Sequence, residues 1–257
     1  MPRELAARCA LVVPCYNEAI RLNVSAYLGF LQAAPDALRI IFVDDGSRDE
    51  TLQILERVRA EAGPERVVIL PKQPNAGKAD AVRYGMTYAM DTLQAEITGF
   101  WDADLATPLD AIYDLLSVLA KLPSIEMVFG ARVKLLGRHV ERNVSRHYLG
   151  RVFATVVSNV LNLPVYDTQC GAKVFRATRE FREVLREPFV SRWIFDVEII
   201  ARFIQRKGVC AMHEAIYEYP LKEWKDVAGS KVGPGDFFKA AGEVVVIRNK
   251  YLRKVMP

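Results

Sequence analysis

Short apolar segments alternate with longer amphipathic stretches through the first half of the chain, and this alternation restricts the possible folds more than any other feature. Apolar runs of strand length that alternate with helical patterns are typical of parallel strands joined by helical crossovers. We therefore expect an α/β fold in which helices flank a mostly parallel sheet. The expected strands are residues 9–14, 39–44, 66–70, 97–101 and 126–130.

Helical patterns fill the stretches between these strands and return in the second half of the chain. Asp49 is a suitable N-cap for the second helix, and Thr107 for a helix that starts at Pro108. No repeat or linker divides the sequence, so residues 1–257 are expected to form a single domain. The expected helices are residues 18–33, 50–62, 75–93, 146–161, 192–207 and 236–254, with a further strand at 213–220.

The composition is that of an ordinary globular protein, and it excludes several classes. The net charge of +4, without a run of Lys or Arg, gives no indication of a nucleic-acid partner. The four cysteines form no CxxC pair, which argues against a zinc site. No signal peptide and no run of about 18 apolar residues occurs, so we expect a cytoplasmic protein whose contact with a membrane is peripheral, on the cytoplasmic face.

Polar residues cluster where three of the expected strands end. These clusters are residues 14–18, 44–47 and 102–104. The carboxyl ends of parallel strands meet at one edge of a sheet, and ligands of such sheets bind beyond that edge. Three polar clusters on one edge indicate a binding site there.

Asp102 and Asp104 are the candidates for a metal site. Residues two apart on an extended segment point to the same side. Two carboxylates placed so repel each other unless a cation lies between them, and Mg²⁺ or Mn²⁺ suits oxygen ligands that are shared with substrate phosphates. If only these two residues are considered, two solvated loop carboxylates are as good an interpretation as a metal site.

Two further clusters have both structural and functional interpretations. The segment Asp44-Asp45-Gly46-Ser47 could be a turn, or its doubled acid could accept hydrogen bonds from a base or ribose. Asn75-Ala76-Gly77-Lys78 could place Lys78 and free backbone N–H groups near phosphate oxygens. The sequence lacks the first glycine of a P-loop and the glycine pattern of a dinucleotide dehydrogenase, and its Asp pair lacks the context of a phosphatase.

A basic stretch follows the fifth expected strand. It includes Arg132, Arg142, Arg146 and Arg151, and it reads either as a solvated helix face or as a pocket for an anionic acceptor. Asp167 is either a base or the partner of one of these arginines. In the segment Asp167-Thr168-Gln169-Cys170-Gly171, the glycine is expected to supply an unusual backbone conformation. Asp196 and Glu198 are expected to pair with the arginines or to line the mouth of the acceptor site.

Taken in order, these clusters resemble the inverting family-two glycosyltransferases of the GT-A fold, a Rossmann-like α/β fold. Within that family the chain looks like the dolichyl-phosphate (polyprenyl-phosphate) β-glucosyltransferase branch. Each motif is weak alone, but the ordered set is specific and spans residues 9–235. The motifs are VVPCYNEAIRL, FVDDGSRDET, NAGKADAVRYGM, FWDADLATP, FGAR, DTQCGAKVF, WIFDVEII and GSKV.

The resemblance implies residue roles. Asp102, Ala103 and Asp104 would form the DxD motif, with Mg²⁺ or Mn²⁺ on the diphosphate of the donor, and Lys231 would close over that diphosphate. Catalysis would involve Asp104, Arg132 and Asp167. The residues implied to bind substrate, together with Lys78 from its own motif, are Pro14, Tyr16, Glu18, Val43, Asp45, Asp102, Ala103, Asp104, Arg132, Arg146 and Lys231.

The implied reaction is transfer of a hexose to a polyprenyl phosphate at a membrane surface, with glucose from UDP-glucose as the favoured donor group. Residues 1–130 would bind the nucleotide sugar and residues 131–257 the acceptor. Ala106 stands where the mannosyl branch has Gln, which favours UDP-glucose over GDP-mannose and leaves the third metal ligand open; Ala172 replaces the usual Phe. The alternatives are transfer to a soluble or polymeric hydroxyl acceptor, which needs a carboxylate base, and a non-catalytic nucleotide-sugar-binding protein.

Overall fold

A seven-stranded sheet forms the centre of the computed structural model, which describes residues 4, 6, 8–141, 144–227, 234–253 and 255, without the side chains of 144–149 and 234–238. The strand order is β3-β2-β1-β4-β7-β5-β8, and only β7 runs antiparallel to its neighbours. The expected mostly parallel sheet is therefore confirmed. The strands are β1 Cys9–Cys15, β2 Arg39–Asp44, β3 Val67–Pro71, β4 Ile97–Trp101, β5 Met127–Ala131, β7 Ala172–Arg176 and β8 Ile216–Pro220.

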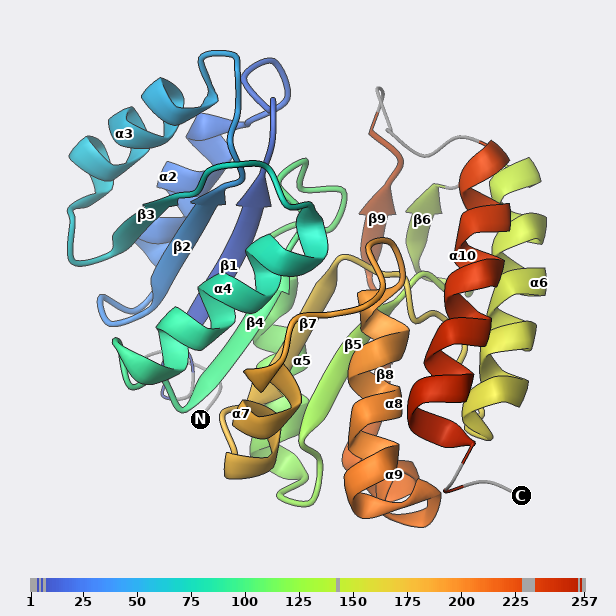
Figure 1. Ribbon diagram of the computed structural model, residues 1–257. Helices are drawn as coiled ribbons and strands as arrows, with labels where there is room; N and C mark the ends of the chain where they lie inside the picture. Colours follow the sequence, from blue (N-terminus) through green and yellow to red (C-terminus); the bar gives the residue numbers. More distant parts are fainter. Residues whose placement is uncertain are drawn as a thin grey trace.

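Helices cover both faces of this sheet (Figure 1). One face packs against α4, α7 and α8, with α10 outside α8, and the other against α2, α3 and α5. None of the helices in the described part of the chain is both long and apolar enough to cross a membrane. The helices are α2 Val24–Ala33, α3 Thr51–Ala62, α4 Lys78–Asp91, α5 Ala111–Lys121, α6 Val144–Leu161, α7 Arg179–Arg186, α8 Phe195–Lys207, α9 Val209–Ala215 and α10 Pro234–Ile247, followed by the π-helix η1 Arg248–Leu252.

The central strands are buried on both faces, which explains their continuous apolar sequences. In β1, Val12 packs into the core on the α4 side, whereas Leu11 and Val13 pack into the core on the α2 side. All three side chains are fully buried. Each contributes on the order of 1.5–3 kcal/mol through removal of its apolar surface from water.

Helices α2, α4, α5 and α8 begin at least three residues later than the sequence pattern indicates, and the starts of α2 and α5 leave loops at the sheet edge. We expected a helix from residue 18, but α2 starts at Val24 because Asn23 is its N-cap and accepts a hydrogen bond from the amide of Ala26. We expected another from Pro108, but α5 starts at Ala111 because residues 108–110 form a turn. The carbonyl of Thr107, meanwhile, accepts a hydrogen bond from the indole of Trp101. The segments ahead of both helices are thereby left in loops beside the sheet edge.

A second, two-stranded sheet lies beyond the carboxyl edge of the main sheet (Figure 1). It pairs β6 His139–Glu141 in parallel with β9 Glu223–Lys225. Strands of three residues give no periodic signal, and the sequence did not indicate them. This small sheet joins the segment after β5 to the segment after β8.

Candidate active site

The predicted polar clusters do meet at one edge of the main sheet. Strands β1, β2 and β4 run parallel, so residues 15–18, 44–47 and 102–104 all follow carboxyl ends on that edge. Because β7 runs the opposite way, its first residues lie at the same edge, with Ala172 paired to Trp101. Strand β5 adds Arg132 there, directly after Ala131.

Asp102 and Asp104 project from a turn at the end of β4. Their side chains are 36% and 24% exposed. Ala103 between them is buried, and its carbonyl accepts a hydrogen bond from the Tyr27 hydroxyl at 3.3 Å. The amide of Asp102 donates to the carbonyl of Gly171 at 2.9 Å, which ties this turn to the start of β7. The two carboxylates are thus held at a fixed, solvent-accessible position.

Each of these carboxylates has a cation of the protein beside it. The ammonium of Lys78 donates a hydrogen bond to Oδ1 of Asp102. Arg21 lies 4.0 Å from Oδ2 of Asp104 and is paired with Glu18 at 2.6 Å. Burial and the charge of Asp102 raise the pKa of Asp104, although the amide of Ala106, Arg21 and Lys78 oppose that shift. The site therefore concentrates negative charge that these cations offset only in part.

The donor set of this turn fits a hard divalent ion that shares its ligands with a substrate. Carboxylate oxygens are the ligands that Mg²⁺ and Mn²⁺ prefer, and such ions commonly keep water and phosphate oxygens as well. Within the described residues no group of three or more His, Cys, Asp or Glu side chains could hold a metal. Two protein carboxylates would leave the remaining positions to a diphosphate and water.

A buried ion pair lies behind the two carboxylates. Nζ of Lys173 on β7 is 2.8 Å from Oδ1 of Asp196 in the first turn of α8, and both side chains are buried. Burial raises the pKa of Asp196, while the positive charges of Lys173 and Lys78 lower it. Asp196 therefore pairs with a lysine that the sequence had not singled out, and not with an arginine of the basic stretch.

Glu198, two residues further on, is also kept away from the site. Its carboxylate is fully buried and accepts hydrogen bonds from Arg202 of the same helix and from the hydroxyl of Tyr251. The expectation that it pairs with the basic stretch or lines the acceptor mouth is wrong, because these contacts fix the packing of η1 on α8.

Gly171 is required for a different reason from the one expected. Its φ is not positive in this structure, so the expected unusual conformation is absent. A Cβ atom at this position would instead lie 2.0 Å from Oδ2 of Asp102. Glycine is needed here because the carboxylate of Asp102 lies against the backbone.

On the acceptor side, Arg132 and Asp167 form a two-point ion pair. Nε and Nη2 of Arg132 each lie 2.7 Å from an Asp167 oxygen, and the Arg132 amide donates to the same carboxylate at 3.0 Å. The guanidinium also lies over the ring of Trp224 at 5.4 Å. Burial lowers the pKa of Arg132, but the charge of Asp167 outweighs it and raises that pKa. Of the two roles considered for Asp167, the geometry favours the holding of an arginine.

The expected nucleoside-binding residues are only partly brought together. Pro14 lies within β1, near its end at the edge, and Tyr16 and Glu18 follow the strand. Val43 is fully buried in the core on the α4 side, so its side chain is outside the site. The carboxylate of Asp45 turns toward the loop before α4 and accepts hydrogen bonds from the amides of residues 76 and 77. Those amides are therefore not free for phosphate, contrary to expectation.

Lys231 and part of the basic stretch cannot be placed in the site. Lys231 and Arg142 lie outside the described residues, and only the backbone of Arg146 is described, within α6. Arg151 lies 3.7 Å above the ring of Tyr166 and donates to its carbonyl. That contact holds the connection between α6 and β7.

The sequence interpretation missed two charged residues, Arg21 and Lys173. Arg21 follows Glu18 at a spacing of three residues, which often marks an ion pair and could have indicated it. Lys173 carries no such signal, because it lies within an apolar strand and its partner is distant in sequence.

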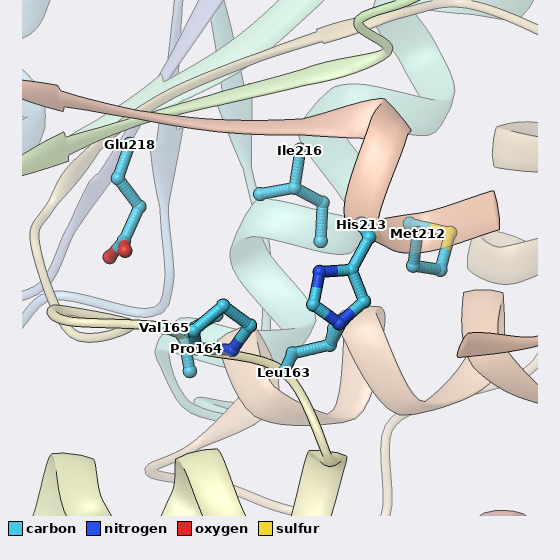
Figure 2. Close-up of a pocket in the computed structure, with 7 residues that line it drawn as sticks. All are labelled: Leu163, Pro164, Val165, Met212, His213, Ile216 and Glu218. Carbon is cyan, nitrogen blue, oxygen red and sulfur yellow. The ribbon is translucent and has the colours of Figure 1, made fainter. Parts of the chain in front are cut away.

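A separate cavity of about 90 Å³ lies between the segment after α6 and strand β8 (Figure 2). Drug-sized ligands occupy pockets of about 300–1,000 Å³, so this cavity is too small for a nucleotide sugar. The carboxylate of Glu218 accepts hydrogen bonds from the amides of Tyr166 and Asp167, which links the cavity wall to the ion pair of Arg132. Its lining residues are Leu163, Pro164, Val165, Met212, His213, Ile216 and Glu218.

Comparison with known structures shows the same fold. Mannosyl-3-phosphoglycerate synthase from Rubrobacter xylanophilus superposes with a TM-score of 0.67 and 21% identity, over 99% of this chain and 79% of its own. Glucosyl-3-phosphoglycerate synthase from Mycobacterium tuberculosis, solved in complex with Mn²⁺ and UDP-glucose, gives a TM-score of 0.63 and 19% identity, over 96% of this chain and 83% of its own. The expected GT-A fold is therefore confirmed.

Sequence comparison identifies the family. The dolichyl-phosphate beta-glucosyltransferase of Saccharomyces cerevisiae is 28% identical over 95% of this chain and 75% of its own length. The enzyme of the same name from Drosophila melanogaster is 31% identical over 88% of this chain and 69% of its own length. The family model for glycosyl transferase family 2 matches residues 10–179. The chain therefore belongs to glycosyl transferase family 2.

Proposed function

We propose that this glycosyltransferase moves glucose from UDP-glucose to a polyprenyl phosphate of the dolichyl type, with inversion at the anomeric carbon. Membership of glycosyl transferase family 2 supports the transfer of a sugar. The acceptor and the sugar are suggested by curated relatives that carry the name dolichyl-phosphate beta-glucosyltransferase and match 95% of this chain.

The ion pair of Arg132 and Asp167 is the observation that carries the choice of acceptor. Both oxygens of Asp167 accept hydrogen bonds from Arg132, so this carboxylate is not poised to take a proton from a substrate. A phosphate monoester needs no such base, because it already carries a nucleophilic oxyanion near pH 7. Arg132, fixed in orientation by Asp167 and Trp224, would offer its remaining N–H groups to that phosphate.

On the donor side, Asp102 and Asp104 would hold Mg²⁺ or Mn²⁺ against the diphosphate. The bound ion would offset the charge that develops on the departing diphosphate. Pro14, Tyr16 and Glu18 border the same edge and would contact the nucleoside, whereas Asp45 would act indirectly by fixing the loop ahead of Lys78. Lys231 would close over the diphosphate, and Arg146 would contact a phosphate.

The two substrates are assigned to the two halves of the chain according to the strands that each half contributes. Residues 1–130 carry the strands β1 to β4 that position Asp102, Asp104 and Lys78, and we assign the nucleotide sugar to them. Residues 131–257 carry Arg132 and Asp167, and we assign the acceptor to them. The methyl side chain of Ala106 has no atom that can bind a metal, which agrees with a UDP-sugar site that lacks the Gln of the mannosyl branch.

A screen of donors and acceptors tests this proposal. UDP-glucose, other UDP-sugars and GDP-mannose are each incubated with polyprenyl phosphate, with a soluble glycoside, or with water, in the presence of Mg²⁺, Mn²⁺ or EDTA. We expect a lipid-linked glucose product from UDP-glucose with a divalent ion. A glycosylated alcohol from the same mixtures would show the hydroxyl alternative, and the lack of any product or donor hydrolysis would show a non-catalytic binding protein.

The variant Asp167→Asn tests the absence of a general base. We expect the KM for polyprenyl phosphate to rise about tenfold or more, because the orientation of Arg132 is weakened, with a smaller change in kcat. The pH profile of kcat should keep its shape, since no proton transfer is removed. A kcat reduced by more than about a thousandfold, together with loss of the acidic limb of the profile, would instead indicate a base and a hydroxyl acceptor.

A further inference from the structure

We propose that Lys78 is an internal counter-ion of Asp102 that gives way when the divalent ion and the donor diphosphate bind. This inference rests on the proposed metal site and specifies how that site is kept stable before the donor arrives. Lys78 is a positioning residue in this proposal, because it acts through the carboxylate of Asp102.

The position of Lys78 is fixed by its surroundings. It is the first residue of α4, and the amides of Ala76 and Gly77 just before it are held by the carboxylate of Asp45. Its ammonium reaches Oδ1 of Asp102 while the side chain remains 43% exposed. The backbone is therefore anchored, whereas the end of the side chain has open solvent into which it can move.

The ammonium and a divalent ion compete for the same oxygen. A metal bound by the two carboxylates would lie about 2.0–2.2 Å from an oxygen of Asp102, where the hydrogen bond of Lys78 now ends. Two cations at one oxygen repel strongly at the low effective dielectric of a partly buried site. The ammonium must leave Asp102 before the ion can take both carboxylates.

The charges around the turn support an exchange of partners. Four carboxylates, those of Glu18, Asp102, Asp104 and Asp196, lie with three cations, those of Arg21, Lys78 and Lys173. With all seven groups ionised this leaves one net negative charge. A divalent ion reverses that sign, and a diphosphate with two negative charges restores it, so the ion and the diphosphate are accommodated together.

The released ammonium has two anionic neighbours to receive it. The carboxylate of Asp196 acts on Lys78 electrostatically in the present arrangement, second only to Asp102 among the neighbouring charges. The ring of Phe100, 5.7 Å from the ammonium, lies alongside. The incoming diphosphate supplies the other anion, so Lys78 would change from a competitor of the metal to a ligand of the donor.

The test is a titration of Mn²⁺ into the full chain, followed by calorimetry or by the electron paramagnetic resonance of free Mn²⁺. Without nucleotide, we expect Lys78→Met to bind Mn²⁺ about tenfold more tightly than the unchanged protein. With UDP present the gain should disappear, because the ammonium then contributes to diphosphate binding. The favourable coupling between Mn²⁺ and UDP should therefore fall in the variant, whichever ligand is titrated second.

Two further variants isolate the charge. Lys72→Met is the matched control, because Lys72 pairs with Asp80 at 2.7 Å and with Asp45 but not with Asp102 or Asp104, and its Mn²⁺ affinity should not change. Lys78→Gln removes the same charge with a polar side chain and should behave like Lys78→Met. The midpoint of thermal unfolding shows that each variant is folded.

Unchanged or weaker Mn²⁺ binding by both Lys78 variants would overturn the proposal, as would an equal gain in Lys72→Met. The measurement needs no sugar transfer, so it separates this inference from the proposed function. Tighter Mn²⁺ binding by a chain that proves inactive with polyprenyl phosphate would reject the acceptor and keep the exchange. Glucose transfer by a chain whose Mn²⁺ affinity does not change in the Lys78 variants would keep the proposed function and reject the exchange.

Discussion

The carboxylates of Asp102 and Asp104 differ in their surroundings although they are two residues apart. Asp102 is paired directly with Lys78, whereas among the described residues Asp104 has the more distant Arg21 and the amide of Ala106 beside it. The pKa of Asp104 is raised by burial and by the charge of Asp102. Asp104 is thus the carboxylate whose ionised form gains most from an added cation.

Asp104→Ala should abolish metal-dependent sugar transfer and leave the fold intact. The side chain makes one hydrogen bond to a local amide and lies at the surface, so its loss removes little packing. We expect kcat/KM with Mn²⁺ to fall at least a hundredfold, equivalent to about 2.7 kcal/mol of transition-state stabilisation.

Asp110→Ala is a suitable control, because Asp110 lies in the nearby turn before α5 and makes no side-chain cap hydrogen bond there. Turnover is measured with UDP-glucose in Mn²⁺ and in EDTA, and unfolding by circular dichroism. Equal turnover by Asp104→Ala and the unchanged protein, with EDTA harmless to both, would remove the metal assignment.

Among the strands, the contact between β4 and β7 determines where Asp102 lies. A Cβ atom on Gly99 of β4 would come within 2.2 Å of the carbonyl oxygen of Lys173 on β7. Gly99→Ala should therefore force the two strands apart and destabilise the protein by about 1–3 kcal/mol. Mn²⁺ binding should weaken as well, because the turn that follows β4 is tied to β7.

Gly29→Ala provides the opposite case for the same substitution. Gly29 lies inside α2, and a Cβ atom there meets nothing within 4 Å. Alanine in a helix interior should raise the free energy of unfolding by about 0.5–1 kcal/mol. Urea unfolding of both variants checks the pair, and a stabilised Gly99→Ala would show that the strand contact tolerates a methyl group.

Helix α10 is held to the start of α8 by one carboxylate. Glu243 accepts hydrogen bonds from the amides of Arg192, Trp193 and Ile194. Glu243→Gln should lower the free energy of unfolding by about 1 kcal/mol, because bonds to a charged acceptor are stronger than bonds to a neutral one. Glu214→Gln, at an exposed position of α9, should change it by less than about 0.5 kcal/mol, and identical urea midpoints for the two variants would contradict this role.

The predictability of the elements follows from how local their causes are. Strands β1 to β5 were predicted because burial on both faces leaves continuous apolar runs in the sequence. The start of α2 was not predicted. Asn23 is a local N-cap signal that went unused, and the turn ahead of it also depends on a hydrogen bond from the amide of Glu18 to Thr51 on α3. The short strands β6 and β9 and the short helix α9 have too few residues for a periodic pattern. Helix α7 does have one, with Phe181, Val184 and Leu185 buried on one face, but the sequence interpretation did not use it.

The same distinction holds for the site. Its place at the sheet edge and its Asp pair were predictable, because strand ends and polar clusters are sequence features. Lys78 was expected near the site from its own motif, and the spacing from Glu18 could have indicated Arg21. The pairing of Lys78 with Asp102 and the place of Lys173 were not predictable, because they depend on the order of the strands. The choice between two roles for Asp167 likewise depended on the two-point contact with Arg132, which spacing alone does not reveal.

At the scale of the whole molecule, binding of the ion and the diphosphate can be measured as a rise in the temperature of unfolding. A ligand that binds only the folded state stabilises it by about 2.7 kcal/mol at a hundred times its Kd. For a chain of this size that corresponds to a rise in Tm of about 5–10 °C. We expect this rise with UDP and Mn²⁺ together, because the diphosphate and the ion neutralise each other at the Asp pair.

Either ligand alone should raise Tm by much less. Mn²⁺ alone must displace Lys78, and UDP alone brings further negative charge to an edge that already carries a net negative charge. UMP with Mn²⁺ is the matched control, since it keeps the nucleoside but lacks the diphosphate, and Asp104→Ala should lose the joint effect. A rise in Tm with UDP that is the same in EDTA and in Mn²⁺ would show that the nucleotide binds without the ion, and that the Asp pair has another purpose.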